Sequence, residues 1–201
     1  GHVTTNMIPL LSDKKVQKMF ITRGPKHSDG WGIAFLEKNN FIIKKSLNPI
    51  YEETKTKDIK NIKTKIAMLH TRFKSIGENK LENNAPFQNG EYIFCHNGTI
   101  RKKINFDKKK YTNHGDTDSE KFFLSILSKD LPIEKAIKDS FNELPLKPNS
   151  NIIISNKNKT YVYSSSRTLQ KYFRMKMGRL NEGLIISSEI IPQLNIKWEE
   201  V

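Results

Sequence analysis

The segment YIFCHNG, residues 92–98, places a run of mostly apolar residues directly before a polar HNG triplet, and the fold prediction starts from it. The run YIFCH is typical of a buried strand, and the Asn97–Gly98 pair after it is a turn signal. Asn97 and the backbone N–H of Gly98 can together stabilise a developing oxyanion, because glycine lets another group approach the backbone closely. The strand is therefore expected to lead into a candidate catalytic site.

The elements expected on either side of this segment fall into blocks. The upstream strands are expected at residues 31–36, 41–45 and 65–70, and the first two form a hairpin across residues 37–40. The downstream elements are helices at 118–127 and 133–144, then strand pairs at 151–155 with 160–164 and at 172–177 with 184–188. Further helices are expected at 9–20 and 58–63, and a last strand at 198–201. Separate blocks of strands and helices favour an α+β fold over an alternating parallel sheet.

Length and composition suit one domain in a reducing compartment. The chain has 201 residues, enough to bury a core, and its apolar runs are too short to cross a bilayer. The first residues carry no signal-peptide pattern, and a single cysteine, Cys95, excludes an internal disulfide. We therefore expect a cytoplasmic protein with no membrane partner.

A formal net charge of +14 raises the question of nucleic-acid binding. The lysines are scattered, however, and only residues 101–103 and 108–110 form clusters. No aromatic residues alternate with these clusters, as a base-stacking platform would need. A lysine-rich solvated surface is the favoured interpretation, and a nucleic-acid interface is the weaker one.

Three further polar segments stand at the expected ends of strands or the start of a helix: HSDGWG (27–32), HTR (70–72) and GDTDSE (115–120). Arg72 at a strand end can grip a carboxylate through two parallel hydrogen bonds. Asp118, at the start of a helix, can accept hydrogen bonds from an ammonium group. One clamp for a carboxylate and one for an ammonium group suit a free amino acid.

The order DGWG, HTR, HNG and TDSE resembles the class II glutamine amidotransferases, which are N-terminal nucleophile hydrolases. The small stand-alone members are the most similar, through HSDGWGIAF, PF…FCHNG and GDTDSE, and the resemblance spans roughly residues 7–188. It implies a single domain over residues 1–201 with a four-layer αββα sandwich, in which two antiparallel sheets lie between helices. It also implies hydrolysis of the glutamine side-chain amide to glutamate and ammonia.

The resemblance assigns roles to individual residues. Arg72 would bind the glutamine carboxylate, with Ser75 at a position where the family usually has threonine. Asp118 would hold the substrate ammonium group, and Asn97 and Gly98 would form the oxyanion hole. The supporting residues would be His70, Asn84 and Asp29.

Several of these residues also have a plain structural interpretation. His70 and His96 suit satisfied core histidines at strand ends, and Asp29 suits a carboxylate that stabilises its loop. Asp116 could cap the helix in place of Asp118, and Arg72 could form a surface ion pair. No set of His, Cys, Asp or Glu has metal-ligand spacing, so neither a metal nor a cofactor is expected.

The nucleophile departs from the family pattern. The family's mature chain starts with a cysteine, whose α-amine serves as the base because its pKa of about 7.7–8.0 lies near neutrality. The chain starts Gly1–His2 instead, so a short strand with the nucleophilic cysteine is expected upstream. Cys95 has no neighbouring α-amine and suits a buried structural role. Thr4 or Thr5 could be the N-terminal nucleophile only if the chain were cleaved directly before that residue.

Several alternatives stay open at this point. The same amino-acid clamp would suit hydrolysis of a γ-glutamyl amide in a biosynthetic intermediate, or an inactive glutamine-binding module. The expected partners are glutamine or a γ-glutamyl substrate. The resemblance also leaves room for a synthetase or another ammonia-accepting partner, and for a homodimer.

Overall fold

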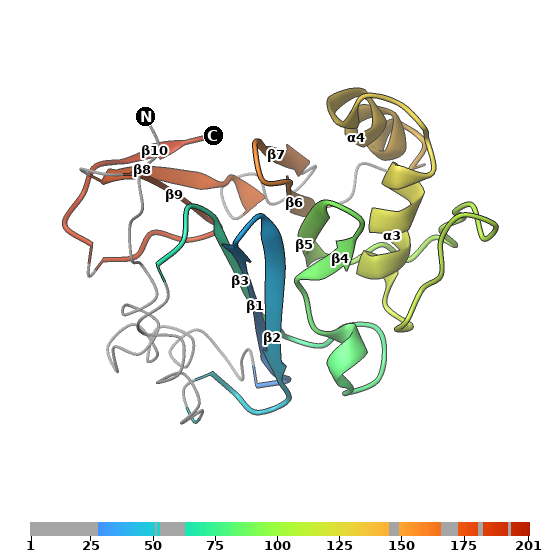
Figure 1. Cartoon of the computed structure of the whole chain (residues 1–201), viewed down its shortest axis with the longest axis horizontal. Helices are drawn as coiled ribbons and strands as arrows, with labels where there is room; N and C mark the ends of the chain where they lie inside the picture. Colours follow the sequence, from blue (N-terminus) through green and yellow to red (C-terminus); the bar gives the residue numbers. More distant parts are fainter. Residues whose placement is uncertain are drawn as a thin grey trace.

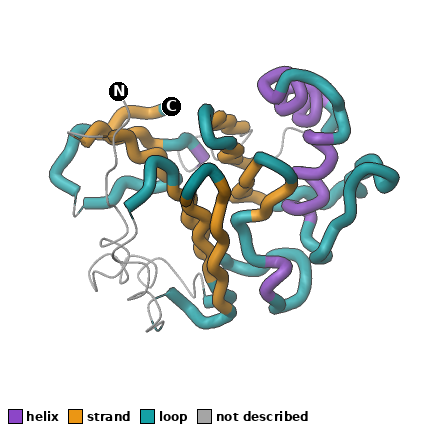
Figure 2. Tube along the Cα trace, in the orientation of Figure 1, coloured by secondary structure: helices purple, strands orange, loops and turns teal. Residues whose placement is uncertain are grey.

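The computed structural model describes residues 28–50, 52, 63–144, 149–165, 173–180, 183–192 and 194–201. Three antiparallel sheets and two α-helices are built from these residues (Figure 1). The helices expected at 9–20 and 58–63 fall wholly or almost wholly outside the described residues. Figure 2 colours the helices, strands and loops along the trace of the chain.

The first sheet has the order β2-β1-β3, with β1 (Trp31–Glu37), β2 (Asn40–Ser46) and β3 (Ala67–Thr71). The expected hairpin of its first two strands is confirmed, with Glu37 opposite Asn40. Lys38 and Asn39 both have positive φ, of 47° and 73°, as a tight hairpin turn of the right twist requires. β3 begins two residues later than the sequence pattern predicts.

The second sheet has the order β4-β5-β6-β7, with β4 (Phe87–Asn89), β5 (Tyr92–Gly98), β6 (Ser150–Ser155) and β7 (Thr160–Ser165). The turn expected at Asn97–Gly98 is wrong, because β5 continues through both residues. Asn97 pairs with Asn151 and Gly98 with Ser150, so β6 supplies ladder partners to the end of the strand. The short strand β4 was not predicted.

Helices α3 (Asp118–Leu127) and α4 (Ile133–Asn142) cover one face of the second sheet (Figure 1). Aromatic rings pack between the sheet and these helices: Phe94 of β5 stacks on Phe123 of α3, with 4.9 Å between the ring centroids. The cap expected at Asp116 or Asp118 is wrong, because the side chain of Thr117 caps α3 by accepting from Glu120 N at 3.2 Å. The backbone of Thr117 is extended, as an N-cap residue requires.

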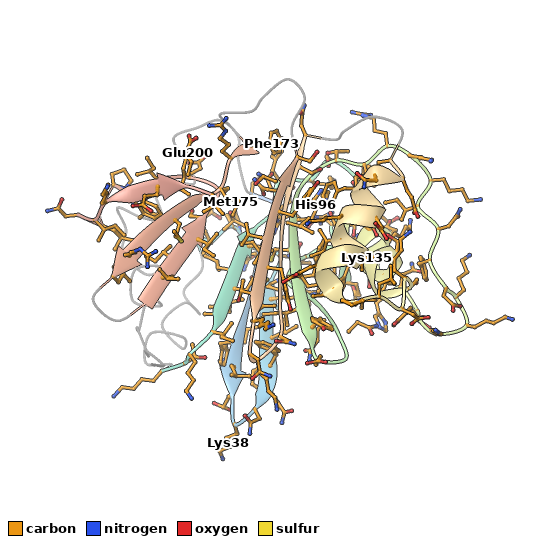
Figure 3. All side chains as sticks on the ribbon, turned by 90° about the horizontal axis from the view of Figure 1, so that it is seen from above. Lys38, His96, Lys135, Phe173, Met175 and Glu200 are labelled. Atoms are coloured by element: carbon orange, nitrogen blue, oxygen red, sulfur yellow. The ribbon has the colours of Figure 1, made fainter. Side chains whose placement is uncertain are left out.

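The third sheet has the order β10-β8-β9, with β8 (Lys176–Leu180), β9 (Gly183–Ser187) and β10 (Trp198–Glu200). It lies beyond β3, on the side away from the helices, in both Figure 1 and Figure 3. The strand expected at 172–177 begins only at Lys176, although Phe173 and Met175 before it are buried.

The molecule is therefore an α+β sandwich of helices on antiparallel sheets, as the motifs predicted. The first sheet approaches the segment that leads into β4 closely at Gly32, where a Cβ atom would collide with the carbonyl oxygen of Ala85. The ring of Phe87 lies beneath Lys45 of β2, whose Nζ is 5.4 Å from the ring centroid. Among the described residues, no helix has the length and apolar character needed to span a bilayer.

Candidate functional site

Arg72 directly follows β3 and organises the loop after it. The side chain is 4% exposed, so a surface ion pair is the wrong interpretation. Its Nη1 donates to Glu78 O at 3.0 Å and to Asn84 Oδ1 at 3.5 Å, and its Nη2 donates to the carbonyls of Ile76 and Gly77 at 3.2 and 3.5 Å. Burial lowers the pKa of Arg72, and the charges of Asp29 and Asp116 oppose that effect. The guanidinium stays charged and holds residues 76–78 around it.

The DGWG segment is joined to this loop through the backbone. Arg72 N donates to Gly30 O at 2.8 Å, and Asp29 N donates to Arg72 O at 3.3 Å. The Asp29 carboxylate accepts from Lys74 N at 2.8 Å. Gly30 has φ of +104°, and a Cβ there would collide with the Asn84 side chain. Glycine at this position therefore lets Asn84 reach the carbonyl of Ser46, to which it donates at 2.8 Å.

Two of the supporting residues differ in their surroundings. Asn84 is fully buried and holds both Arg72 and the end of β2, through Ser46. His70 is half-buried on β3, opposite Gly32 of β1. Asn84 thus bonds directly to Arg72, and His70 lies two residues before Arg72 in the chain, on β3.

The two faces of β5 carry different chemistry. His96 faces α3, where its Nδ1 bonds Ser119 Oγ at 2.9 Å and its Nε2 bonds Ser150 Oγ at 3.1 Å. Burial lowers the pKa of His96 to about 4, so the ring is neutral near pH 7 and both nitrogens are occupied. His96, labelled in Figure 3, is thus the satisfied core histidine that the sequence suggested. Cys95 and Asn97 lie on the opposite face, because neighbouring strand residues alternate.

Gly98 needs to be glycine for reasons of space and backbone conformation. Its φ is +149°, and a Cβ would lie 2.5 Å from Ser150 Oγ, 2.7 Å from Asn149 O and 2.8 Å from His96 Nε2. Asn97, beside it, is half-buried, and within the described part of the chain its side chain makes no hydrogen bond. No described residue therefore forms a hydrogen bond with its amide.

The end of β5 is bonded to both clamps that the sequence suggested. Thr99 Oγ1 donates to Ser75 Oγ at 2.9 Å, which ties β5 to the loop of Arg72. Ile100 N donates to Asp118 Oδ2 at 2.6 Å, which ties β5 to the start of α3. Asp118 is 7% exposed; burial raises its pKa, and hydrogen bonds from Ile100 and Ser119 oppose the rise.

The GDTDSE segment is held by its own last residue and by an asparagine that the sequence did not single out. Glu120 accepts from His114 N at 2.9 Å and from Gly115 N at 2.7 Å. Asp116 N donates to Asn83 Oδ1 at 2.9 Å. The only sequence signal for Asn83 was its place directly before Asn84 in ENNAPF, and for Thr99 its place directly after HNG.

Hydrogen bonds thus connect segments that lie far apart in the sequence: residues 29–30, 72–78, 83–84, 97–100 and 116–118. His27, at the start of the first motif, lies outside the described residues. Cys95 is buried, and burial raises the pKa of its thiol, so it is unsuited to nucleophilic attack. Within the described residues, no group of three or more His, Cys, Asp or Glu side chains could hold a metal ion.

The sequence of the chain matches that of a known family. Residues 16–176 match the family described as "Glutamine amidotransferases class-II". A relative in Escherichia coli, YafJ, whose name carries a provisional assignment as a glutamine amidotransferase, is 32% identical over 112 residues, covering 53% of this chain and 44% of that protein. An uncharacterized protein of Methanocaldococcus jannaschii is 31% identical over 135 residues, covering 62% of this chain and 37% of that protein. The chain thus spans less than half the length of these relatives.

Solved structures show the same fold at low sequence identity. A glutamine aminotransferase class-II domain protein from Silicibacter pomeroyi superposes with a TM-score of 0.65 at 18% identity, covering 85% of this chain and 83% of that one. An allosteric regulatory enzyme of purine biosynthesis superposes with a TM-score of 0.74 at 19% identity, covering 99% of this chain and 44% of that one.

Proposed function

The chain belongs to the class II glutamine amidotransferases, and on that basis we propose that it hydrolyses the side-chain amide of glutamine to glutamate and ammonia. The observation that carries the proposal is that the two residues directly after β5 bond to both parts of the site: Thr99 reaches Ser75 in the loop of Arg72, and Ile100 reaches Asp118. An oxyanion hole at Asn97 and Gly98 would then lie next to the groups that hold the amino-acid end of the substrate.

In this proposal Arg72 and Asp118 bind the amino-acid end of glutamine. Two of the four guanidinium contacts of Arg72 are 3.5 Å long, so their N–H groups are the ones that a carboxylate would engage. Asp118 has one oxygen bonded to Ile100 N, which orients the carboxylate and leaves capacity for an ammonium donor. Ser75 would assist Arg72 from the same loop.

The reaction would proceed through a cysteinyl thioester. A cysteine thiol upstream of Gly1 would lose its proton to its own α-amine and attack the amide carbon. The Asn97 amide and the Gly98 N–H would stabilise the oxyanion, and ammonia would leave with the transferred proton. Water would then hydrolyse the thioester to glutamate and restore the thiol. The one cysteine in the sequence, Cys95, is buried, which supports placing the nucleophile elsewhere.

The ammonia would pass to a synthetase or another accepting partner, and the domain would act in the cytoplasm, alone or as a homodimer. The same clamp would also suit a γ-glutamyl amide in a biosynthetic intermediate, because that substrate presents the same amino-acid end. A chain without the upstream cysteine would bind glutamine without turnover.

The test uses the protein made from its natural gene, with its N-terminal residue determined by intact mass and terminal sequencing. We expect an N-terminal cysteine, release of glutamate from glutamine, and loss of that release in Asp118→Ala. The matched control is Glu134→Ala, which removes an exposed carboxylate from the first turn of α4 and should keep full activity. Faster release from γ-glutamyl amides would favour the alternative substrate, and binding without release would favour the inactive module. Unchanged turnover in Asp118→Ala would overturn the site.

A further inference from the structure

The loop after Arg72 is gripped from two opposite sides. On one side the Arg72 guanidinium holds the carbonyls of residues 76–78. On the other, Asn83 of the short 3-10 helix η2 (Leu81–Asn83) donates from Nδ2 to Glu78 O at 2.8 Å, and Asp116 Oδ2 accepts from Glu78 N at 3.3 Å. Glu78 O therefore receives hydrogen bonds from both Arg72 and Asn83.

Asn83 and Asp116 also bond each other in two directions. Asn83 Nδ2 donates to Asp116 Oδ1, and Asp116 N donates to Asn83 Oδ1 at 2.9 Å. Asn83 is 3% exposed, and its two N–H groups and its oxygen are all engaged. Burial raises the pKa of Asp116, but the hydrogen bonds from Asn83 and Glu78 and the charge of Lys80 lower it overall. The carboxylate is therefore kept ionised as a fixed acceptor.

Two glycines make this close arrangement feasible. Gly77 has φ of +86°, and a Cβ on it would lie 2.8 Å from Asp116 Oδ1 and 3.1 Å from Asn83 Nδ2. A Cβ on Gly115 would collide with Asn83 Oδ1. The Arg72 loop is thus pressed directly onto the residues that lead into α3.

The contacts form one continuous path between the two proposed clamps: from Arg72 through Glu78 O to Asn83, then to Asp116, which lies two residues before Asp118. We propose that Asn83 and Asp116 are positioning residues that fix the distance between the carboxylate clamp and the ammonium clamp. They would thereby set the selectivity for ligands that carry both groups on one α-carbon. The inference rests on the proposed function, because that function makes Arg72 and Asp118 the clamps.

The test compares two probes, L-glutamine and glutaramate, which keeps the carboxylate but lacks the α-ammonium group. The variant Asn83→Asp has the same size but loses both N–H donors and sets a second carboxylate against Asp116. We expect calorimetry to show about 10- to 100-fold weaker binding of L-glutamine, and a much smaller loss for glutaramate, which needs only Arg72. The preference for L-glutamine over glutaramate should therefore fall.

The matched control is Asn79→Asp, which makes the same charge change at an exposed position of the same loop. It should leave the preference unchanged. The double variant Asn83→Asp with Asp116→Asn restores a donor facing an acceptor and should recover part of the preference. If Asn83→Asp does not fold, the milder Asp116→Asn serves in its place, with the same direction of change expected.

Three results separate the possibilities. If the unmodified protein does not bind L-glutamine, the proposed function fails before the positioning role is reached. If it binds, but Asn83→Asp keeps the same preference as Asn79→Asp, the positioning role is overturned and the proposed function stands. The positioning role would also be overturned if Asn83→Asp lowered the melting temperature but left the preference for L-glutamine over glutaramate unchanged in folded molecules. That result is the signature of a purely structural contact.

Discussion

Two regions of the molecule are held together in different ways. Aromatic rings pack against one another among the second sheet and its two helices. The ring centroids of Phe122 and Phe141 are 5.0 Å apart in an edge-on contact, and those of Phe141 and Tyr163 are 4.5 Å apart. Around Arg72 and Asp116, by contrast, side chains bond to backbone groups of loops. Ring packing tolerates small shifts because dispersion is weakly directional, whereas hydrogen bonds weaken steeply with distance and angle. The first region therefore stabilises the fold, and the second fixes positions.

The aromatic region should give the largest loss of stability. Phe141→Ala removes a ring that is 4% exposed and contacts both α3 and β7, and we expect it to lower the free energy of unfolding by about 3–5 kcal/mol. Denaturant titration measures this loss, and folded molecules should bind L-glutamine as before. Phe73→Ala is the control, because Phe73 is 59% exposed and should change stability by less than about 0.5 kcal/mol. Similar losses in both variants would contradict the division between the regions.

Gly98 stands where the two regions meet, and its substitution should have an intermediate effect. Gly98→Ala sets a Cβ against Ser150, Asn149 and His96 at a positive φ, and we expect a loss of about 2–4 kcal/mol together with loss of activity. Gly90→Ala is the control for a positive φ without crowding, because Gly90 has φ of +54° and nothing lies within 4 Å of its Cβ position. That control should lose about 1 kcal/mol and keep its activity. Equal losses would mean that crowding at Gly98 is unimportant.

Asp118 should show the smallest effect on stability and a large effect on binding. Burial raises its pKa, so its contribution to stability is present at low pH and is lost as the pH rises through the raised value. We expect Asp118→Asn to be at least as stable as the unmodified protein at pH 7, and that relative advantage should shrink as the pH falls toward about 4. Denaturant titrations at the two pH values test the sign. L-glutamine binding should weaken by about 10- to 100-fold at pH 7.

Local patterns predicted most of the regular structure. The helix expected at 118–127 is α3 to the residue, because a strong apolar face begins directly after residues suited to a helix start. The hairpin around Lys38 and Asn39 was predicted from its turn residues. The end of β5 was not predicted correctly. An Asn–Gly pair on its own is a turn signal, and only the pairing with β6 shows that the strand continues through it.

The candidate site shows the same limit. Arg72, Asn97, Gly98 and Asp118 were singled out because their chemistry is visible in short motifs. Asn83 was not, since its partners are Glu78 and Asp116, and the contact with Asp116 spans 33 residues. The cap of α3 was also assigned to the wrong residue, because three adjacent residues, Asp116, Thr117 and Asp118, can each cap a helix and only backbone geometry selects Thr117.

The burial of Cys95 has a practical consequence for experiments in solution. A buried thiol with a raised pKa reacts with alkylating reagents only when the surrounding sheet opens. Cys95 lies in the middle of β5, paired with Ile153 of β6. Its alkylation rate would therefore report how often the second sheet opens. An exposed N-terminal cysteine would be alkylated at once, and the two rates could be read from one mass-spectrometry time course.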